Sequence, residues 1–256
     1  MSPQPSYAYP LGLLSGWTCD VIAGRRRSFR LDAQACIGRL RPPLRVRGAE
    51  NIPRDGPCVL TVNHYDRRGF DAWWIALAVA AAVPVEMHWV MTNELTFPGR
   101  WYAPLGRPAS RLLLRRFARV YGFTGMPPMP PRPRDAVARA EAVRRVLSHL
   151  KAHPEAILGL APEGGDMPHG ALSWPPPGAG RFLLLLAEAG FKIVPAGAFE
   201  ADGAFCLTFG PAYNLSLPPG LSSEEKDRSA ARTVMAQIAR QLPPRLRGEF
   251  APSAEE

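Results

Sequence analysis

The sequence predicts one α/β domain, with a mainly parallel central sheet flanked by helices and an N-terminal helical segment before it. Short apolar runs typical of strands buried on both faces alternate with helical patterns along the chain. Such alternation favours a parallel sheet covered by its crossover helices. The length of 256 residues fits one large domain. No internal repeat and no linker marks a second one.

The expected elements follow in order along the chain. Residues 1–40 have the pattern of helices, apolar first and basic second. Strands are expected over 44–47, 58–62, 86–91, 156–161, 193–199 and 205–209. Helices are expected over 72–83, 178–189 and 222–242, from a cap at Asp135 to a stop at His153-Pro154, and over 97–119 with Pro and Gly breaks. We therefore assign 1–40 to an N-terminal segment that is a candidate membrane-interface anchor, 41–250 to the domain, and 251–256 to a disordered tail.

Composition and charge limit the kinds of partner. Hydrophobic residues make up 46% of the chain and charged residues 21%, a globular balance that needs no metal or disulfide to support a core. The net charge of +9 favours anionic partners such as lipid headgroups, a phosphorylated cofactor or an acidic carrier protein. No nucleic-acid-binding motif is present, so we expect no nucleic-acid partner.

The cysteines and histidines predict neither disulfides nor a metal site. The four cysteines are scattered without C-x-x-C spacing, and they are expected to be reduced, mostly buried thiols of a cytoplasmic protein. His149 and His153 lie four residues apart near the end of an expected helix. We expect this to be a solvated helix end, with no bound metal.

Two apolar stretches bear on membrane association. The run 72–85 is too short to span a bilayer, ends at Pro84 and Glu86, and is expected to be a buried helix. The aromatic and aliphatic residues within 7–22, followed by Arg25 to Arg27, either lie in a membrane interface or pack on the core. No positively charged stretch precedes them, so we expect no cleavable signal.

Residues able to do chemistry follow two of the expected strands. Asn63-His64 ends the strand at 58–62, and Pro162-Glu163-Gly164-Gly165 breaks the strand at 156–161. Ligands of parallel α/β sheets bind outside the carboxyl ends of the strands. If both strands run parallel, a histidine and a carboxylate far apart in the sequence share one cleft.

His64 has the properties of a general base. Imidazole titrates near neutrality, and a carboxylate on its second nitrogen fixes the tautomer and stabilises the charged form. Asp66 and Asp71 follow closely enough to supply that carboxylate. There is no G-x-S-x-G motif and no cysteine beside His64, so no enzyme nucleophile is expected. The attacking group is then expected to come from the substrate, for example an alcohol.

A set of short motifs lies in order around these residues. It comprises Arg45 to Pro53 with Gly56-Pro57 and Val62-Asn63-His64, then Ala161-Pro162-Glu163-Gly164, Ile193-Val194-Pro195-Ala196, and Leu242 to Gly248. In order and spacing the set resembles the blocks of the glycerolipid acyltransferase family, part of the lysophospholipid acyltransferase superfamily. The best-known members are the 1-acylglycerol-3-phosphate acyltransferases. The resemblance covers residues 40–250.

The resemblance implies a reaction and its partners. The family transfers an acyl chain from a thioester, on coenzyme A or acyl-carrier protein, to a glycerol hydroxyl without an acyl-enzyme. On this basis His64 is the base, an aspartate orients it, and Asn63, Pro162, Glu163 and Gly164 bind substrate. For Glu163 a second role is open, which is to brace its loop through backbone N–H groups. We expect no bound cofactor, with acyl-CoA or acyl-carrier protein as co-substrate. The expected partners are a lipid acceptor and the membrane surface, which the protein would occupy peripherally on the cytoplasmic inner face.

The aspartate departs from the family pattern. The family has N-H-x-x-x-x-D, but Gly69 occupies the last position here and Asp71 lies two residues later. Asp71 directly precedes the expected helix, as the family aspartate does, so we favour it as the partner of His64. Asp66 remains its rival.

Two arginines of the family pattern are also missing. In the F-P-E-G-T-R-S block, Asp166 replaces the phosphate-binding arginine and would repel an acceptor phosphate. The middle block lacks its arginine, for which Arg132 and Arg134 are candidate substitutes. These losses favour another acceptor, such as a glycolipid, an aminolipid or a polyol. They also leave two alternatives: a catalytically degenerate member that binds lipid or a partner, and an acyl hydrolase.

Overall fold

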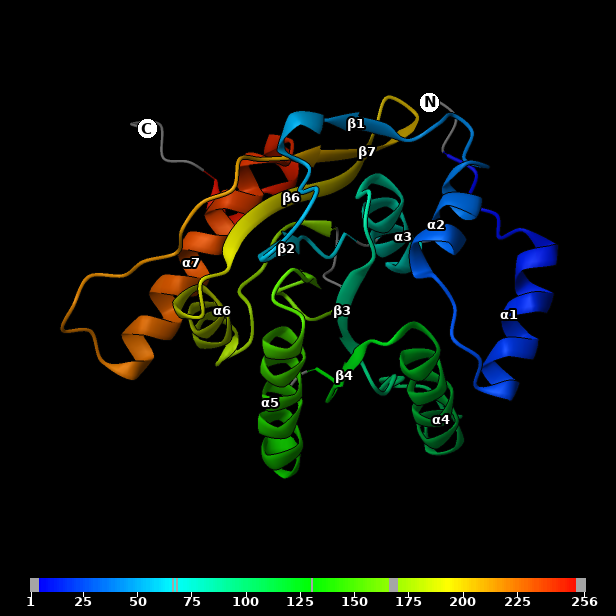
Figure 1. Ribbon diagram of the computed structural model, residues 1–256, viewed down its shortest axis with the longest axis horizontal. Helices are drawn as coiled ribbons and strands as arrows, with labels where there is room; N and C mark the ends of the chain where they lie inside the picture. The colour runs from blue at the N-terminus through cyan, green and yellow to red at the C-terminus, as the bar shows by residue number, and fades with distance from the viewer. Residues whose placement is uncertain (1–4, 66, 68, 130, 166–169, 252–256) are drawn as a thin grey trace.

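The computed structural model of the protein describes residues 5–65, 67, 69–129, 131–165 and 170–251. Asp66, Asp166 and all but the first residue of the expected disordered tail at 251–256 lie outside these residues. The centre of the molecule is a seven-stranded sheet in the order β1-β7-β6-β2-β5-β3-β4 (Figure 1). Its strands are β1 (Arg45–Arg47), β2 (Cys58–Val62), β3 (Met87–Thr92), β4 (Thr124–Met126), β5 (Ile157–Leu160), β6 (Lys192–Ala201) and β7 (Ala204–Phe209).

The sheet is mainly parallel, which confirms the expected class. Strands β6, β2, β5, β3 and β4 pair in parallel with one another, and β1 is parallel to β7. The β6–β7 pair is antiparallel, because a tight hairpin joins the two strands at Asp202 and Gly203, both with positive φ. The five residues of β2 are all buried, as expected of a central strand covered on both faces.

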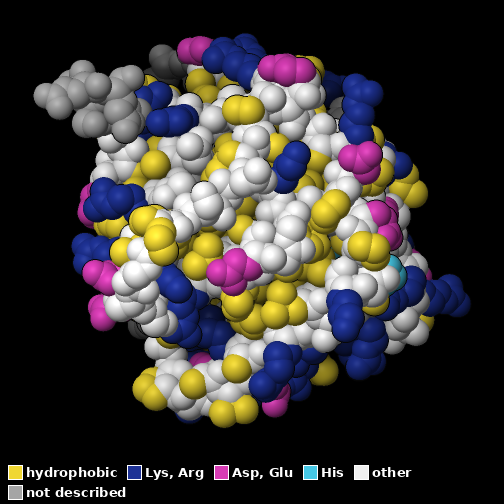
Figure 2. All heavy atoms as spheres, turned by 60° about the vertical axis from the view of Figure 1, so that its left-hand side comes forward, with side chains coloured by type: hydrophobic (Ala, Val, Ile, Leu, Met, Phe, Trp, Pro, Cys, Tyr) yellow, Lys and Arg dark blue, Asp and Glu magenta, His cyan; other side chains and the backbone are white. Residues whose placement is uncertain are grey.

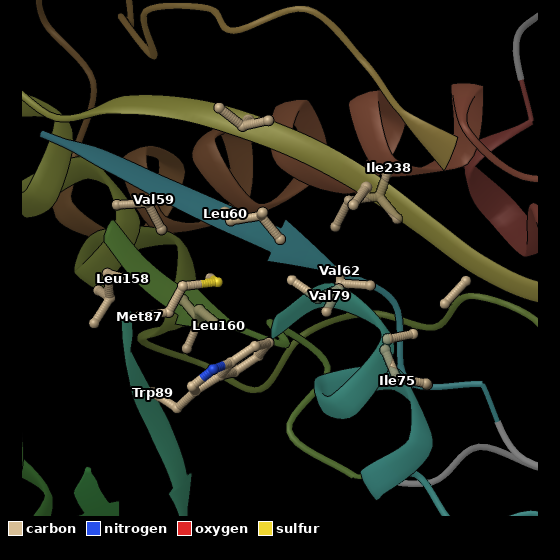
Figure 3. Close-up of a cluster of buried hydrophobic side chains, with 14 of the residues drawn as sticks. Val59, Leu60, Val62, Ile75, Val79, Met87, Trp89, Leu158, Leu160 and Ile238 are labelled. Atoms are coloured by element: carbon tan, nitrogen blue, oxygen red, sulfur yellow. The ribbon is translucent and has the colours of Figure 1, made fainter. Parts of the chain in front are cut away.

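Helices cover both faces of the sheet. Helix α7 packs on β6 and β2, and α3 lies on the opposite side of β2 (Figure 3). Helix α2 packs against α3, and α6 against α7. The helices are α1 (Leu11–Ala23), α2 (Phe29–Ile37), α3 (Trp73–Ala82), α4 (Ala103–Tyr121), α5 (Ala136–Ala152), α6 (Ala179–Glu188) and α7 (Ser223–Arg240), with 3-10 turns at Ala49–Asn51, Pro133–Asp135, Pro244–Leu246 and Gly248–Phe250.

The core between β2, β5 and α3 depends on a glycine in β5. Val62, Val79 and Trp89 belong to this core cluster (Figure 3). A Cβ atom at Gly159 would lie 2.5 Å from the Trp89 indole. Glycine at position 159 therefore leaves the space that the Trp89 indole occupies against β5. Trp89 also lines the cavity described below.

Three local expectations need correction. Residues 103–121 form one continuous helix, because Pro108 lies near its first turns and removes a single backbone bond, while Ser110 and Leu114 anchor the buried face. The Asp135 carboxylate does not cap α5 but accepts a hydrogen bond from Arg132. His149 is only partly exposed, because its ring stacks on the buried His88 ring, with centroids 3.8 Å apart.

The N-terminal segment is tied to the domain through a buried carboxylate. Asp32 on α2 accepts hydrogen bonds from Arg27 and from the hydroxyl of Tyr121 at the end of α4. Arg27 also donates a hydrogen bond to Asp20 on α1.

The expected buried helix at 72–83 is α3. In the part of the chain that the structure describes, no helix is both long and apolar enough to cross a bilayer. The net charge of +9 appears as basic side chains spread over the face in Figure 2.

We expect His88 to make the fold sensitive to acid. Burial and the neighbouring His149 lower the pKa of His88 to about 4, whereas histidine in an unfolded chain titrates at about pH 6.5. The unfolded state therefore binds the proton more tightly. The stability from neutral His88 is complete above about pH 6.5 and declines, by at most about 3 kcal/mol, as the pH falls towards 4.

Urea unfolding of the wild type and of His88→Gln at several pH values tests this. The wild type should lose its stability advantage over the variant between neutral and acidic pH. The difference between the two proteins isolates His88, since Glu94 and Glu200 also titrate in acid with lowered pKa values. An advantage that stays constant with pH would contradict the prediction.

Candidate active site

The two strand ends predicted to share a cleft do meet. Strands β2 and β5 pair in parallel, with Thr61 opposite Leu160, so the residues that follow them emerge at the same edge. There the Oε2 atom of Glu163 accepts a hydrogen bond from the backbone N–H of His64 at 2.7 Å. The expected juxtaposition of histidine and carboxylate is confirmed, although this contact involves the histidine backbone and not its ring.

Glu163 is the most buried carboxylate in this region. Its side chain is 2% exposed, and its second oxygen accepts the backbone N–H of Ser173 at 2.9 Å. Burial raises the pKa of Glu163, and the two backbone hydrogen bonds counteract only part of this shift. Glu163 therefore braces the loop before Trp174 against the end of β2. This is one of the two roles, bracing or substrate binding, that the motif allows.

Asn63 joins the end of β2 to β6. Its amide donates to the carbonyl of Ala198 at 2.9 Å, and its side-chain oxygen accepts the Ala198 N–H at 2.7 Å. The side chain is 1% exposed, so both polar groups are used inside the protein. The Asn63 side chain thus continues the hydrogen bonding between β2 and β6 at the residue directly before His64. Its expected substrate contact stays a prediction.

A second carboxylate, Glu200 on β6, holds the residues after His64. It accepts hydrogen bonds from the hydroxyls of Tyr7 at 2.7 Å and Tyr65 at 3.2 Å, and from the guanidinium of Arg67. Burial on its own would raise the pKa of Glu200, but the Arg67 and Tyr7 hydrogen bonds outweigh it and lower the pKa. Sequence reasoning missed Glu200, which lies one residue beyond the strand expected at 193–199 and just before the Asp202-Gly203 turn.

His64 opens onto a cavity of about 1010 Å³ at this edge of the sheet. The charged side chains among its described lining residues are His64, Asp71, Glu94 and Glu163. Most of the wall is apolar, including Trp73, Ile75, Trp89, Met91, Leu114 and Phe123. Within the described residues, no group of three or more His, Cys, Asp or Glu side chains could hold a metal ion. The site is therefore a large apolar chamber with a histidine at the end of β2.

Asp71 shares this cavity with His64. It precedes α3, its carbonyl accepts the Trp74 N–H at 2.9 Å, and its side chain is exposed. Asp66 lies outside the described residues. The choice of Asp71 as the partner of His64 stays a prediction.

The Pro162-Glu163-Gly164 motif forms a turn at the cavity wall. The N–H of Gly164 bonds the carbonyl of Ala161 at 3.1 Å, and Gly164 has a φ of 71°. A Cβ atom at Gly164 would come within 2.9 Å of Met129. Glycine is therefore required both by the backbone conformation and by the close approach of the loop that carries Met129. Pro162 is buried beneath the turn.

The two candidate substitutes for the missing arginine differ. Arg132 donates to the buried Glu94 at 3.1 Å and also pairs with Asp135, whereas Arg134 is exposed. Arg111 on α4 binds the same Glu94 carboxylate. Burial tends to raise the pKa of Glu94, but the two arginines outweigh it and lower the pKa. Neither Arg132 nor Arg134 is among the described residues that line the cavity. Their role in substrate binding stays a prediction.

Sequence reasoning missed Glu94. The signal that could have found it is a carboxylate two residues beyond an apolar strand, on the edge to which His64 and Glu163 also point. Through Arg111 and Arg132, Glu94 ties α4 to the loop before α5, and so closes one side of the cavity.

A mainly parallel α/β sheet with a histidine at its carboxyl edge, beside a large apolar chamber, is an α/β fold whose cavity suits an apolar ligand. Residues 43–198 match the family model described as Acyltransferase. This match covers more than half of the chain, which therefore belongs to the Acyltransferase family and is an acyltransferase enzyme. The resemblance drawn from the motifs is confirmed. The sequence matches none of the curated proteins with which it was compared.

The fold also resembles that of a solved structure. The crystal structure of PlsC from Thermotoga maritima, a 1-acyl-sn-glycerophosphate (LPA) acyltransferase, superposes with a TM-score of 0.51. The two sequences are 16% identical, and the match covers 83% of this chain and 76% of the other. At this identity the likeness establishes the α/β fold.

Replacing Glu163 with glutamine is expected to lower stability. Glutamine has one acceptor oxygen, whereas the carboxylate serves the N–H groups of His64 and Ser173. One buried N–H is left unpaired, which costs about 1–3 kcal/mol. Urea unfolding measures this loss, with Glu141→Gln on the exposed face of α5 as the matched control. An unfolding free energy equal to that of the control would contradict the bracing role.

Proposed function

We propose that the protein transfers a fatty acyl chain from a thioester donor, acyl-CoA or acyl-carrier protein, to a hydroxyl of a lipid acceptor, with His64 as general base. The observation that carries this proposal is the position of His64 at the end of β2, where its backbone is held by Glu163 and its side chain borders an apolar cavity of about 1010 Å³. Family membership supplies the reaction class. The protein would act peripherally at the cytoplasmic face of a membrane.

The reaction needs one base and no enzyme nucleophile. The His64 imidazole removes the proton of the acceptor hydroxyl while its oxygen attacks the thioester carbonyl carbon. The tetrahedral intermediate then collapses, the C–S bond breaks, and the imidazolium returns its proton to the departing thiolate. A carboxylate that orients the ring, Asp71 by our preference, stabilises the imidazolium formed on the way. The apolar wall accommodates the acyl chain.

The charges around the cavity favour an acceptor without a phosphate group. The described charged residues that line it are His64 and three carboxylates. The nearby Arg111 and Arg132 both pair with one of these, Glu94, and so do not present free positive charge. A polyol, a glycolipid or an aminolipid fits this lining better than a phosphomonoester, which the carboxylates would repel.

His64→Ala is expected to lower the rate of acyl transfer by roughly a hundredfold or more, because no other base replaces the imidazole. Release of free thiol from acyl-CoA or acyl-carrier protein, measured with and without lipid acceptors, tests this. His153→Ala, which removes an exposed histidine distant in sequence from the cavity residues, is the matched control. Undiminished transfer by a folded His64→Ala protein would refute the mechanism, and fatty acid released without any acceptor would indicate a hydrolase.

Asp71→Asn is expected to lower the rate by at least roughly tenfold, while Asp66→Asn retains most of the activity, because a neutral amide cannot stabilise the imidazolium. Release of free thiol from the donor, measured for both variants beside the wild type, tests this. The reverse pattern, with Asp66→Asn inactive and Asp71→Asn active, would assign the role to Asp66.

A further inference from the structure

The segment that leads into and forms α4 has an unusual surface. Large hydrophobic side chains are exposed at six positions within it, which we call the Trp101 patch: Leu95, Trp101, Tyr102, Leu105, Leu112 and Leu113. Trp101 is 87% exposed and Leu105 77%, values that leave these side chains almost entirely in water. Single exposed apolar residues are normal, but a cluster of this kind marks an interaction site.

Helix α4 turns two of these residues, Leu105 and Leu112, to the side away from the domain. Ala103, Ser110 and Leu114 form the buried face of α4, whereas Leu105 and Leu112, seven residues apart, lie together on the opposite face. Arg116, four residues beyond Leu112, continues the same face. The exposed side of α4 is therefore apolar in its first half and basic in its second.

The charge of the segment is entirely positive. Residues 95–121 contain six arginines and no aspartate or glutamate. Arg111 is paired with Glu94, but no carboxylate of the described residues pairs with Arg115, Arg116 or Arg119. Basic side chains are spread over other surfaces too, as Figure 2 shows, so charge alone would not single out this one. This surface is distinguished by having these arginines beside exposed tryptophan and leucine side chains.

The patch adjoins the catalytic chamber. Leu95 belongs to the patch and also lines the cavity. Thr96 and Pro98, which follow it, line the cavity as well. Leu114, next to Leu113 on α4, lines the cavity from inside. A surface bound to the Trp101 patch therefore lies at the same end of the molecule as the apolar chamber.

We propose that the Trp101 patch docks the protein on an anionic lipid bilayer, with Trp101 and Leu105 inserted at the headgroup boundary and Arg115, Arg116 and Arg119 against lipid phosphates. Tryptophan and leucine beside arginine is the composition of helices that lie in a membrane interface. Each arginine near an anionic surface contributes attraction, and none of these three first has to break an ion pair within the described protein. The inference rests on the proposed function in that a lipid acceptor resides in a bilayer.

This assignment differs from the N-terminal anchor that the sequence suggests. Helix α1 also exposes apolar residues, Leu11 at 81% and Ile22 at 69%. However, Arg27 in the basic stretch after it is paired with Asp20 and Asp32. Helix α1 packs against α4 but contributes none of the described residues that line the cavity. Its exposed residues therefore provide a matched control for the patch.

Vesicle sedimentation tests the proposal without turnover. The full-length protein is mixed with vesicles of phosphatidylcholine alone, or of phosphatidylcholine with phosphatidylglycerol. The Trp101→Ser/Leu105→Ser protein should bind roughly tenfold or more weakly to the anionic vesicles, since two inserted apolar side chains are lost. Arg115→Gln/Arg116→Gln should lose the preference for anionic vesicles by a similar factor. Leu11→Ser/Ile22→Ser should bind as the wild type does. Thermal unfolding confirms that these surface variants remain folded.

Three results would overturn the assignment. The Trp101→Ser/Leu105→Ser protein could bind as tightly as the wild type, or the α1 control could lose as much binding as the patch variant. Alternatively, the arginine variant could keep its vesicle binding and lose activity only with acyl-carrier protein as donor, which would make the surface a carrier site. His64→Ala should bind vesicles normally. A protein that binds through the patch yet transfers no acyl group would refute the proposed function and leave the docking surface intact.

Discussion

The site depends on one buried hydrogen bond, from the backbone N–H of His64 to the carboxylate of Glu163. It joins the ends of β2 and β5, two strands separated by 99 positions in the sequence and brought together by parallel pairing. Because parallel strands end at a common edge, the bond forms only when the central sheet is in its native register. A slip of one residue would turn the inward side chains of β2 to the other face and separate the histidine from its brace.

A row of polar contacts extends this arrangement to either side of His64. Asn63 exchanges two hydrogen bonds with Ala198, and Glu200 gathers Tyr7, Tyr65 and Arg67 around the loop that follows. Burying these groups is unfavourable unless each one is paired, and the described contacts pair them. The result is a histidine whose backbone is held by neighbouring strands, with its ring at the edge of an apolar chamber. Such support from a second layer of contacts is what keeps a catalytic group in position.

Electrostatics divide the molecule into two parts. The chain as a whole carries a net charge of +9, but the described charged groups that line the chamber are acidic apart from His64. Glu94 lies at the boundary, since it lines the chamber and neutralises Arg111 and Arg132 behind the wall. The positive charge of α4 is thereby kept on its outer face, beside the exposed leucines and tryptophan. The same helix thus closes the chamber on one side and presents a basic, apolar surface on the other.

The sequence by itself determined the class of fold, the main strands and helices, the family and the approximate place of the site, because periodicity, strand-end residues and motif order are local properties. It placed β2, β5, β6, β7 and α3 within a few residues, and it brought His64 and Glu163 to one edge by topology alone. It did not distinguish bracing from substrate binding for Glu163, did not find Glu94 or Glu200, and expected Pro and Gly breaks within 97–119, where α4 is continuous from residue 103. Those points were decided only by the tertiary structure, since the partner that a buried carboxylate meets, and the packing that carries a helix past a proline, come from residues distant in the chain.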